Sequence, residues 1–223
     1  MFDPRVNLRR YEKEVTAIEQ NPVRKGQIIF YGSSTFNNWR EKEKNHNLED
    51  DLLGKDGKPA CLNHAFGGCT AEELLYYYPR LIKPYEPRAL VVCVFPNDRG
   101  AGYSPMEVMA NLSKLLAWAR TDFPGIRLYL CDCRPVLNID GIQVPNNMRE
   151  YHKLMRHYCA EHPDTTYVAH EECPDFWIDP QDAGSFEGSK IRKELFIADQ
   201  VHFNQNGYDI YKKFFANVLD DIL

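Results

Sequence analysis

The sequence predicts an α/β fold: a single domain in which a five-stranded parallel sheet lies between two layers of helices, as a three-layer α/β/α sandwich. From Gly26 onward, short apolar runs rich in β-branched residues alternate with longer helical patterns, which is typical of βαβ units. A chain of 223 residues with 43% hydrophobic residues can fill one sizeable core. No internal repeat or low-complexity tract interrupts this alternation.

The individual elements are marked by local signals. Thr70, with Glu73 three residues later, forms a capping box at a helix start, and a second box around Ser104 places Pro at the first helical position. Residues 148–162 and 207–223 carry apolar side chains at spacings of three and four, which indicates amphipathic helices. The predicted strands are residues 27–31, 60–63, 89–94, 126–131 and 165–168.

Segments outside this pattern complete the expected organisation. Residues 6–20 form a polar helix candidate, so we expect residues 1–25 to be a helical extension packed on a single domain that spans residues 1–223. Two irregular stretches remain, 37–59 and 171–197. Long loops in a compact domain are often functional.

Composition excludes several classes of partner. The formal charge is -5, and no run of basic residues would follow a phosphate backbone, so we expect no nucleic acid partner. No segment approaches the roughly 18 to 20 apolar residues of a membrane span, and the N-terminus lacks the apolar core of a signal peptide, so we expect a cytoplasmic protein. Seven cysteines without a CxxC pair predict no disulfide framework. The oligomeric state stays open.

Small and polar residues follow the predicted strands, where a parallel sheet binds its ligands. They are Ser33 and Ser34 after the first strand, Gly67 and Gly68 after the second, and Asn97 and Asp98 after the third. Asp199 and His202 lie three residues apart before the last helix. A hydroxyl, an imidazole, a carboxylate and donors for an oxyanion are the groups that acyl transfer requires. A G-x-S-x-G elbow is absent, which argues against the usual α/β-hydrolase arrangement.

These segments resemble the four blocks of the SGNH, or GDSL-type, hydrolases. The matching segments are Gly32-Ser33-Ser34 with Trp39 after it, NHAFGGCTAEELL, the Asn97-Asp98 pair, and Asp199-x-x-His202, in that order from about Gly26 to the C-terminus. The resemblance implies a flavodoxin-like fold and a serine esterase that needs no cofactor or metal. Its partner would be a small-molecule ester.

The same resemblance implies a role for each matching residue. Ser34 would be the nucleophile, His202 the general base, and Asp199 the carboxylate that orients the imidazole. The backbone N–H groups of Ser34 and Gly68, with the side-chain amide of Asn97, would form the oxyanion hole. Because the base must be neutral, activity is expected to rise with pH near the ordinary histidine value of about 6.5.

We expect four further residues to contact the substrate: Ser33, Trp39, Gly67 and Phe95. Phe95 departs from the family pattern, because the third block usually reads Gly-x-Asn-Asp and this chain has Phe95-Pro96-Asn97-Asp98. A large ring therefore replaces a glycine beside Asn97, which changes the expected shape of the pocket.

The substrate and two alternative functions stay open. We favour a short acyl group, such as acetyl on a carbohydrate or small molecule, over a lysophospholipase or thioesterase activity. A binding module with weak catalysis would account for Phe95. A zinc-dependent hydrolase could use Cys131, Cys133 and a histidine, since thiolates two apart on a strand point to the same face.

Overall fold

The central sheet has five parallel strands in the order β2-β1-β3-β4-β5 in the computed structural model, which describes residues 5–40, 46–137, 146–185 and 190–223. The strands are β1 (Ile28–Gly32), β2 (Cys61–Asn63), β3 (Ala89–Cys93), β4 (Arg127–Cys131) and β5 (Thr165–Val168). Each predicted strand is present, with ends that differ by no more than one residue. The predicted α/β class and parallel sheet are confirmed.

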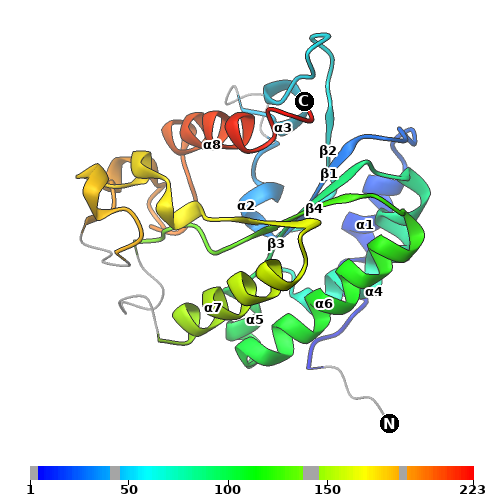
Figure 1. Ribbon diagram of the computed structural model, residues 1–223, viewed down its shortest axis with the longest axis horizontal. Helices are drawn as coiled ribbons and strands as arrows, with labels where there is room; N and C mark the ends of the chain where they lie inside the picture. The colour runs from blue at the N-terminus through cyan, green and yellow to red at the C-terminus, as the bar shows by residue number, and fades with distance from the viewer. Residues whose placement is uncertain (1–4, 41–45, 138–145, 186–189) are drawn as a thin grey trace.

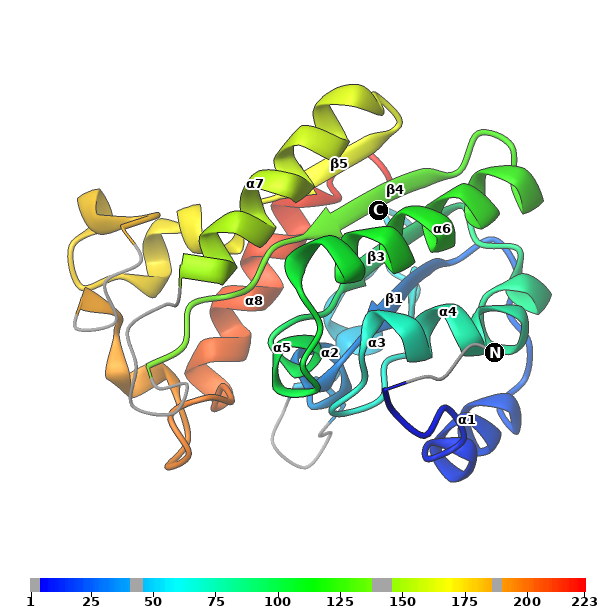
Figure 2. The ribbon, with the colours of Figure 1, turned by 90° about the horizontal axis from the view of Figure 1, so that it is seen from below.

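Helices cover both faces of this sheet (Figures 1 and 2). One layer holds α1 (Glu12–Glu19), α4 (Ala71–Leu81), α6 (Pro105–Asp122) and α7 (Asn146–Glu161). The other holds α2 (Ser34–Asn37), α3 (Leu48–Asp51) and α8 (Gln205–Val218), and α5 (Asn97–Gly100) follows β3. Helices on both faces of a parallel sheet make the predicted three-layer sandwich.

The alternation of side chains along each strand divides the core in two. In β1, Ile29 and Tyr31 pack in the cluster that also contains Leu74 of α4, whereas Ile28 and Phe30 pack with Phe215 of α8. Successive side chains of a strand point to opposite faces, so one strand supplies both clusters. All five residues of β1 are buried, as expected for a central parallel strand.

Both predicted capping boxes are present. The Thr70 side chain accepts the Glu73 N–H while the Glu73 carboxylate accepts the Thr70 N–H, and Ser104 and Glu107 do the same at the start of α6. Each box satisfies backbone donors that have no partner within the helix. α4 and α6 therefore begin where the sequence predicts.

The N-terminal helix is shorter than predicted. Residues 6–11 form turns, because the Asn7 side chain accepts the N–H of Arg9, and α1 begins only at Glu12. Val15 and Ile18 of α1 are buried in the core cluster on that face. The predicted extension thus packs on the sheet through α1, while its residues 1–4 lie outside the described residues.

The last helix also ends earlier than predicted. α8 stops at Val218, where the sequence pattern continued to residue 223. Asp220 and Asp221 follow, and carboxylates are unfavourable at the negative end of a helix dipole. In the irregular stretches, the described parts contain α3 and several short 3₁₀ turns, including Pro174–Phe176.

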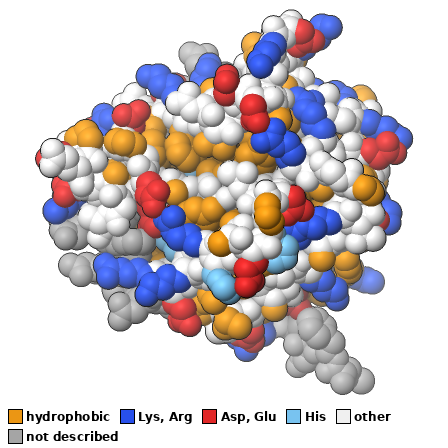
Figure 3. All heavy atoms as spheres, viewed as in Figure 1, with side chains coloured by type: hydrophobic (Ala, Val, Ile, Leu, Met, Phe, Trp, Pro, Cys, Tyr) orange, Lys and Arg blue, Asp and Glu red, His pale blue; other side chains and the backbone are white. Residues whose placement is uncertain are grey.

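β5 is an edge strand of the sheet, and its residues line a groove together with residues of α8. Figure 3 shows hydrophobic side chains gathered below α8 on this face, and the groove, of about 470 Å³, is lined by Val168, Phe214 and Val218 among others.

Among the described residues, no helix is long and apolar enough to cross a membrane.

Candidate active site

Ser34 stands at the end of β1, at the place where the strand order reverses. β1 pairs with β2 on one side and β3 on the other, so a crevice opens beyond its carboxyl end. The residue before the two serines must be glycine, since a Cβ on Gly32 would lie 2.2 Å from the carbonyl oxygen of Cys93. This close approach of β1 and β3 presents Ser34 at the first position of α2.

His202 and Asp199 reach Ser34 from the loop before α8. The distance from His202 Nδ1 to Asp199 Oδ2 is 2.6 Å, and that from His202 Nε2 to Ser34 Oγ is 3.0 Å. Asp199 Oδ1 also accepts the backbone N–H groups of Val201 and His202, each at 2.9 Å. The structure therefore places the three predicted residues in one hydrogen-bonded chain.

The charge on Asp199 is strongly favoured by its surroundings. Burial by itself raises the pKa of this carboxyl, but hydrogen bonds from the His202 and Val201 backbone and from the imidazole lower it to about 2. Asp199 is therefore ionised at neutral pH. An ionised carboxylate at Nδ1 keeps a proton on that nitrogen and leaves Nε2 free to accept the Ser34 proton.

Gly68 lies in a tight turn that is held by the N-terminal segment. Its φ is +80°, a conformation that favours glycine, and a Cβ there would lie 2.9 Å from the Tyr11 hydroxyl. The Arg10 guanidinium donates to the Gly68 carbonyl at 3.1 Å and forms an ion pair with the buried carboxylate of Glu73. Contacts from residues outside the family blocks thus fix this glycine.

Asn97 joins two pockets beside Ser34. With Ser34 and His202 it lines a small pocket of about 100 Å³, and with Gly68 it lines an open pocket of about 500 Å³. One N–H of its amide donates to the carbonyl of Cys69 at 3.2 Å, which leaves the second N–H for a ligand. Gly67 lies nearby, since a Cβ on it would be 4.0 Å from the Cβ of Ser34.

Phe95 has a left-handed backbone, a conformation that favours glycine. Its φ is +67°, and its buried ring stacks on Tyr151 with ring centroids 4.5 Å apart. Its N–H donates to the Asp98 carboxylate, which also accepts the N–H of Ala71. These hydrogen bonds hold the turn before Asn97, and the ring forms part of the wall of the small pocket.

The expected contact between Trp39 and a substrate is not what the structure shows. Trp39 is fully buried against Phe30 and Phe215, and its indole N–H donates to Asp51 at 2.8 Å. An indole without exposed surface belongs to the core. Ser33, by contrast, lines the small pocket as expected, although it is itself buried.

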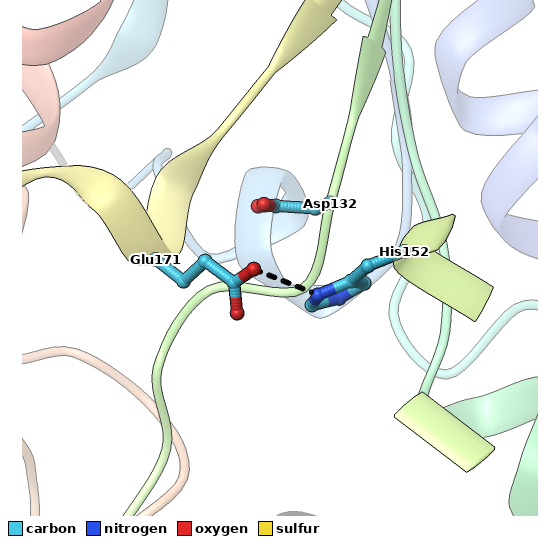
Figure 4. Close-up of side chains that lie close together, drawn as sticks. All are labelled: Asp132, His152 and Glu171. Carbon is cyan, nitrogen blue, oxygen red and sulfur yellow. Dashed lines mark hydrogen bonds and ion pairs between the residues drawn. The ribbon is translucent and has the colours of Figure 1, made fainter. Parts of the chain in front are cut away.

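Cys131 and Cys133 do not form a metal centre with a histidine among the described residues. Both thiols are buried, which raises their pKa well above the ordinary value, and the Cys133 thiol donates to the carbonyl of Phe95. The described residues bring together a different group, Asp132, His152 and Glu171, whose ligand atoms lie within 4.8 Å of one another (Figure 4).

Hydrogen bonds account for the geometry of that group. His152 Nδ1 lies 3.0 Å from the Glu171 carboxylate, and His152 Nε2 accepts the N–H of Cys133. Asp132 accepts the Tyr167 hydroxyl at 2.8 Å and a backbone N–H at 2.7 Å. Burial raises the pKa of Asp132 to about 7 and that of Glu171 to about 8, which favours protonated carboxyls in this network.

The sequence analysis missed several residues of the small pocket, among them Arg134, Val136, Met148 and Val201. Arg134 had a detectable signal. Arg134 follows the fourth strand as Ser34 follows the first. Because ligands bind beyond the carboxyl ends of parallel strands, polar residues after the fourth strand are site candidates too, and Arg134 is one of them. Val136 and Met148 carry no such signal, because tertiary packing brings them to the pocket.

Comparisons with known proteins agree with this geometry. The model of the GDSL-like Lipase/Acylhydrolase family matches residues 30–210 of the chain. The fold is similar to that of a Bacteroides fragilis protein described as an acylhydrolase, with 16% identity, a TM-score of 0.70 and 99% of each chain covered. A GDSL-like lipase from Bacteroides thetaiotaomicron gives 16% identity and a TM-score of 0.69, with 99% of this chain and 100% of that chain covered.

A third solved structure has a described substrate. It is a variant of an acetyl-xylooligosaccharide esterase from Geobacillus Stearmophilus, with 14% identity and a TM-score of 0.62, covering 87% of this chain and 94% of that chain. At such identities the likeness to solved structures shows the fold. A search of curated protein sequences gives no match.

Proposed function

This chain belongs to the GDSL-like lipase/acylhydrolase family, and we propose that it hydrolyses carboxylic esters with Ser34 as nucleophile, His202 as general base and Asp199 as the supporting carboxylate. The observation that carries the proposal is the continuous chain from Ser34 Oγ to His202 Nε2 and from His202 Nδ1 to Asp199 Oδ2, at 3.0 Å and 2.6 Å. Nucleophile, base and orienting group within hydrogen-bond reach are the arrangement that activates a serine.

In the first half of the proposed reaction, His202 Nε2 takes the Ser34 proton while Ser34 Oγ bonds to the ester carbonyl carbon. The carbonyl oxygen becomes an oxyanion that accepts hydrogen bonds from the N–H groups of Ser34 and Gly68 and from the free amide N–H of Asn97. The intermediate then collapses, the C–O bond to the alcohol breaks, and the imidazolium protonates the departing oxygen.

In the second half, water attacks the acyl-enzyme. His202 takes a proton from the water as the new C–O bond forms; the bond from the acyl carbon to Ser34 Oγ then breaks, and the imidazolium returns the proton to Ser34 as the acid leaves. The negative charge of Asp199 stabilises the imidazolium in both halves. The ester and one water are the reactants, and the proton that Ser34 gives up in the first half is restored in the second, so the reaction balances.

The size of the small pocket supports a short acyl group such as acetyl. Its volume of about 100 Å³ equals the space of roughly three molecules of liquid water. The larger pocket on the Gly68 side, of about 500 Å³, is open and has room for the alcohol part of a carbohydrate or small molecule. A structural neighbour that is an esterase of acetylated xylooligosaccharides is consistent with this choice.

Hydrolysis of a series of 4-nitrophenyl esters, from acetyl to dodecanoyl, tests the activity and the acyl length together. The proposal predicts kcat/KM highest for acetyl or propionyl esters and lost in Ser34→Ala. Highest turnover on octanoyl or longer esters would favour the lysophospholipase or thioesterase alternative. No turnover of any ester by folded protein would favour the binding module.

A further inference from the structure

Arg134 is a buried cation in the pocket that holds Ser34 and His202. Its relative exposure is 6%, and it lines the small pocket together with the proposed nucleophile and base. Arginine is almost never fully buried in proteins unless it is paired with an anion. The position of Arg134 beside the reacting atoms therefore calls for an explanation.

Among the described residues, only neutral groups hold the Arg134 guanidinium in place. Nε donates to the Thr35 hydroxyl at 3.2 Å, Nη1 donates to the carbonyl of Pro135 at 3.4 Å, and the guanidinium lies 4.6 Å from the ring centroid of Phe203. Within residues 5–40, 46–137, 146–185 and 190–223, no carboxylate oxygen lies within 4.0 Å of a guanidinium nitrogen of Arg134, and Nη2 of Arg134 makes no hydrogen bond.

The nearest carboxylate in sequence is occupied elsewhere. Asp132, two residues before Arg134, accepts hydrogen bonds from the Tyr167 hydroxyl and the His170 N–H. Asp199 is bound to the His202 imidazole on the opposite side of that ring from Ser34. Neither acid supplies the counter-charge that a buried guanidinium normally has.

A buried charge without a partner is unfavourable, because desolvation is not offset by an opposite charge. The contact with Phe203 offsets part of it, since an aromatic face attracts a cation. The remaining donors form a planar fork whose geometry matches a carboxylate. A ligand with such a group would satisfy Nη2 and supply a negative charge that the described residues do not place beside Arg134.

We propose that Arg134 binds a carboxylate of the substrate, so that the preferred substrates are esters bearing a carboxylate within a few bonds of the scissile carbonyl. This inference rests on the proposed esterase function. The short reach follows from the size of the pocket, because Ser34, His202 and Arg134 all line the same volume of about 100 Å³. The carboxylate could belong to the acyl part or to the alcohol part of the ester.

Two pairs of substrates locate the carboxylate. On the acyl side, 4-nitrophenyl hemisuccinate is compared with 4-nitrophenyl butyrate, and on the alcohol side, acetoxyacetate is compared with its amide. We expect kcat/KM for the anionic member of one pair to exceed that of its neutral match by roughly 10- to 100-fold, the range for a hydrogen bond to a charged group. The pair that shows the preference identifies the side.

Variants test whether Arg134 causes the preference. Arg134→Gln should lower the anionic-to-neutral ratio to about one, and Arg134→Lys should retain part of it, because the charge stays while the fork is lost. Arg9→Gln removes an exposed arginine that lines no pocket described above and should keep the full ratio. An equal ratio in wild type and Arg134→Gln, or no preference in either pair, would overturn the inference.

A binding measurement separates this inference from the proposed function. In Ser34→Ala protein, acetoxyacetate and succinate should raise the unfolding temperature, and Arg134→Gln in the same background should abolish the rise. If no ester is turned over but this shift depends on Arg134, the esterase fails and the carboxylate site stands. If esters are hydrolysed without any carboxylate preference and neither anion shifts the unfolding temperature, the carboxylate site fails and the esterase stands.

Discussion

The Nε2 atom of His202 lies 3.0 Å from the Oγ atom of Ser34, although the two residues are 168 positions apart in the chain. One sits at the end of β1, an inner strand of the sheet, and the other in the loop before the last helix. The parallel sheet brings them together because both segments lie at the carboxyl ends of the strands.

Asp199→Asn should lower kcat while leaving the fold intact. The amide cannot supply the negative charge that keeps the proton on His202 Nδ1, and the comparable change in a well-studied serine protease lowers kcat about 10⁴-fold. We expect a loss of roughly 10²- to 10⁴-fold, measured with 4-nitrophenyl acetate. Glu194→Gln alters another carboxylate of the same part of the chain, paired only with Arg192 and the backbone, and should leave kcat unchanged. Equal activity of Asp199→Asn and wild type would contradict the assigned role.

Asn97→Ala should reduce kcat by about 10²- to 10³-fold with little change in KM, as expected when one oxyanion donor is removed. The side chain also donates to the Cys69 carbonyl, so an unfolding curve of the variant is needed beside the kinetics. A rise in KM at constant kcat would instead show that Asn97 contributes equally to binding of substrate and transition state.

Phe95→Gly should be more stable than Phe95→Ala. Both variants lose the stacked ring, which typically costs about 3 to 5 kcal/mol in a core, but only alanine keeps a side chain at a φ of +67°. The left-handed backbone is unfavourable for alanine by roughly 1 to 2 kcal/mol. Urea unfolding of the two variants measures this difference.

Phe95→Gly should also accept longer acyl groups than the wild type, because the ring of Phe95 forms one wall of the small pocket. An unchanged acyl-length profile would contradict that placement.

Glu171 should make folding less stable as the pH rises from about 5 to 8. Burial raises the pKa of this carboxyl to about 8, whereas an unfolded glutamate has a pKa of about 4.3. Between these values the folded protein binds a proton that the unfolded chain does not, so stability falls with increasing pH. Glu171→Gln should flatten this slope in thermal unfolding curves, and Glu172→Gln, which alters an exposed neighbour, should retain it. Parallel slopes in all three proteins would contradict a protonated Glu171.

Arg10→Gln should destabilise the protein and lower kcat together. The substitution leaves the Glu73 carboxylate, which is 0% exposed, without its bidentate partner, and it frees the Gly68 carbonyl. Breaking a buried pair costs about 3 to 5 kcal/mol, and we expect roughly 2 to 3 because Arg10 itself is 40% exposed. Arg9→Gln is the matched control. A loss of stability at unchanged kcat would show that this ion pair does not position Gly68.

Local signals in the sequence predicted the fold well. The capping box at Thr70 and the apolar runs of the five strands depend on neighbouring residues, so they can be read without the fold. The family resemblance is confirmed, and Ser34, Asp199 and His202 lie together as that resemblance implied. Their catalytic roles stay predictions, as do those of Gly68 and Asn97.

Features that depend on tertiary packing could not be predicted in the same way. Trp39 lies five residues after Ser34, yet its side chain points into the core on the α8 side of the sheet. Val136 and Met148 reach the pocket through tertiary packing that the sequence does not specify. The zinc alternative depended on two thiols that share one face of a strand, and the sequence does not show which groups surround them. In the structure, the Cys133 thiol donates to the Phe95 carbonyl and the Cys133 N–H donates to the His152 ring.

Labelling with a fluorophosphonate probe, followed by peptide mapping, tests the central claim most directly. Only a serine activated by a neighbouring base reacts readily with such a probe. The proposed function predicts one adduct, on Ser34, that persists in Ser33→Ala and disappears in Ser34→Ala and His202→Ala. Folded wild-type protein that gains no adduct, or gains it on a serine other than Ser34, would contradict the assignment of Ser34 as the nucleophile.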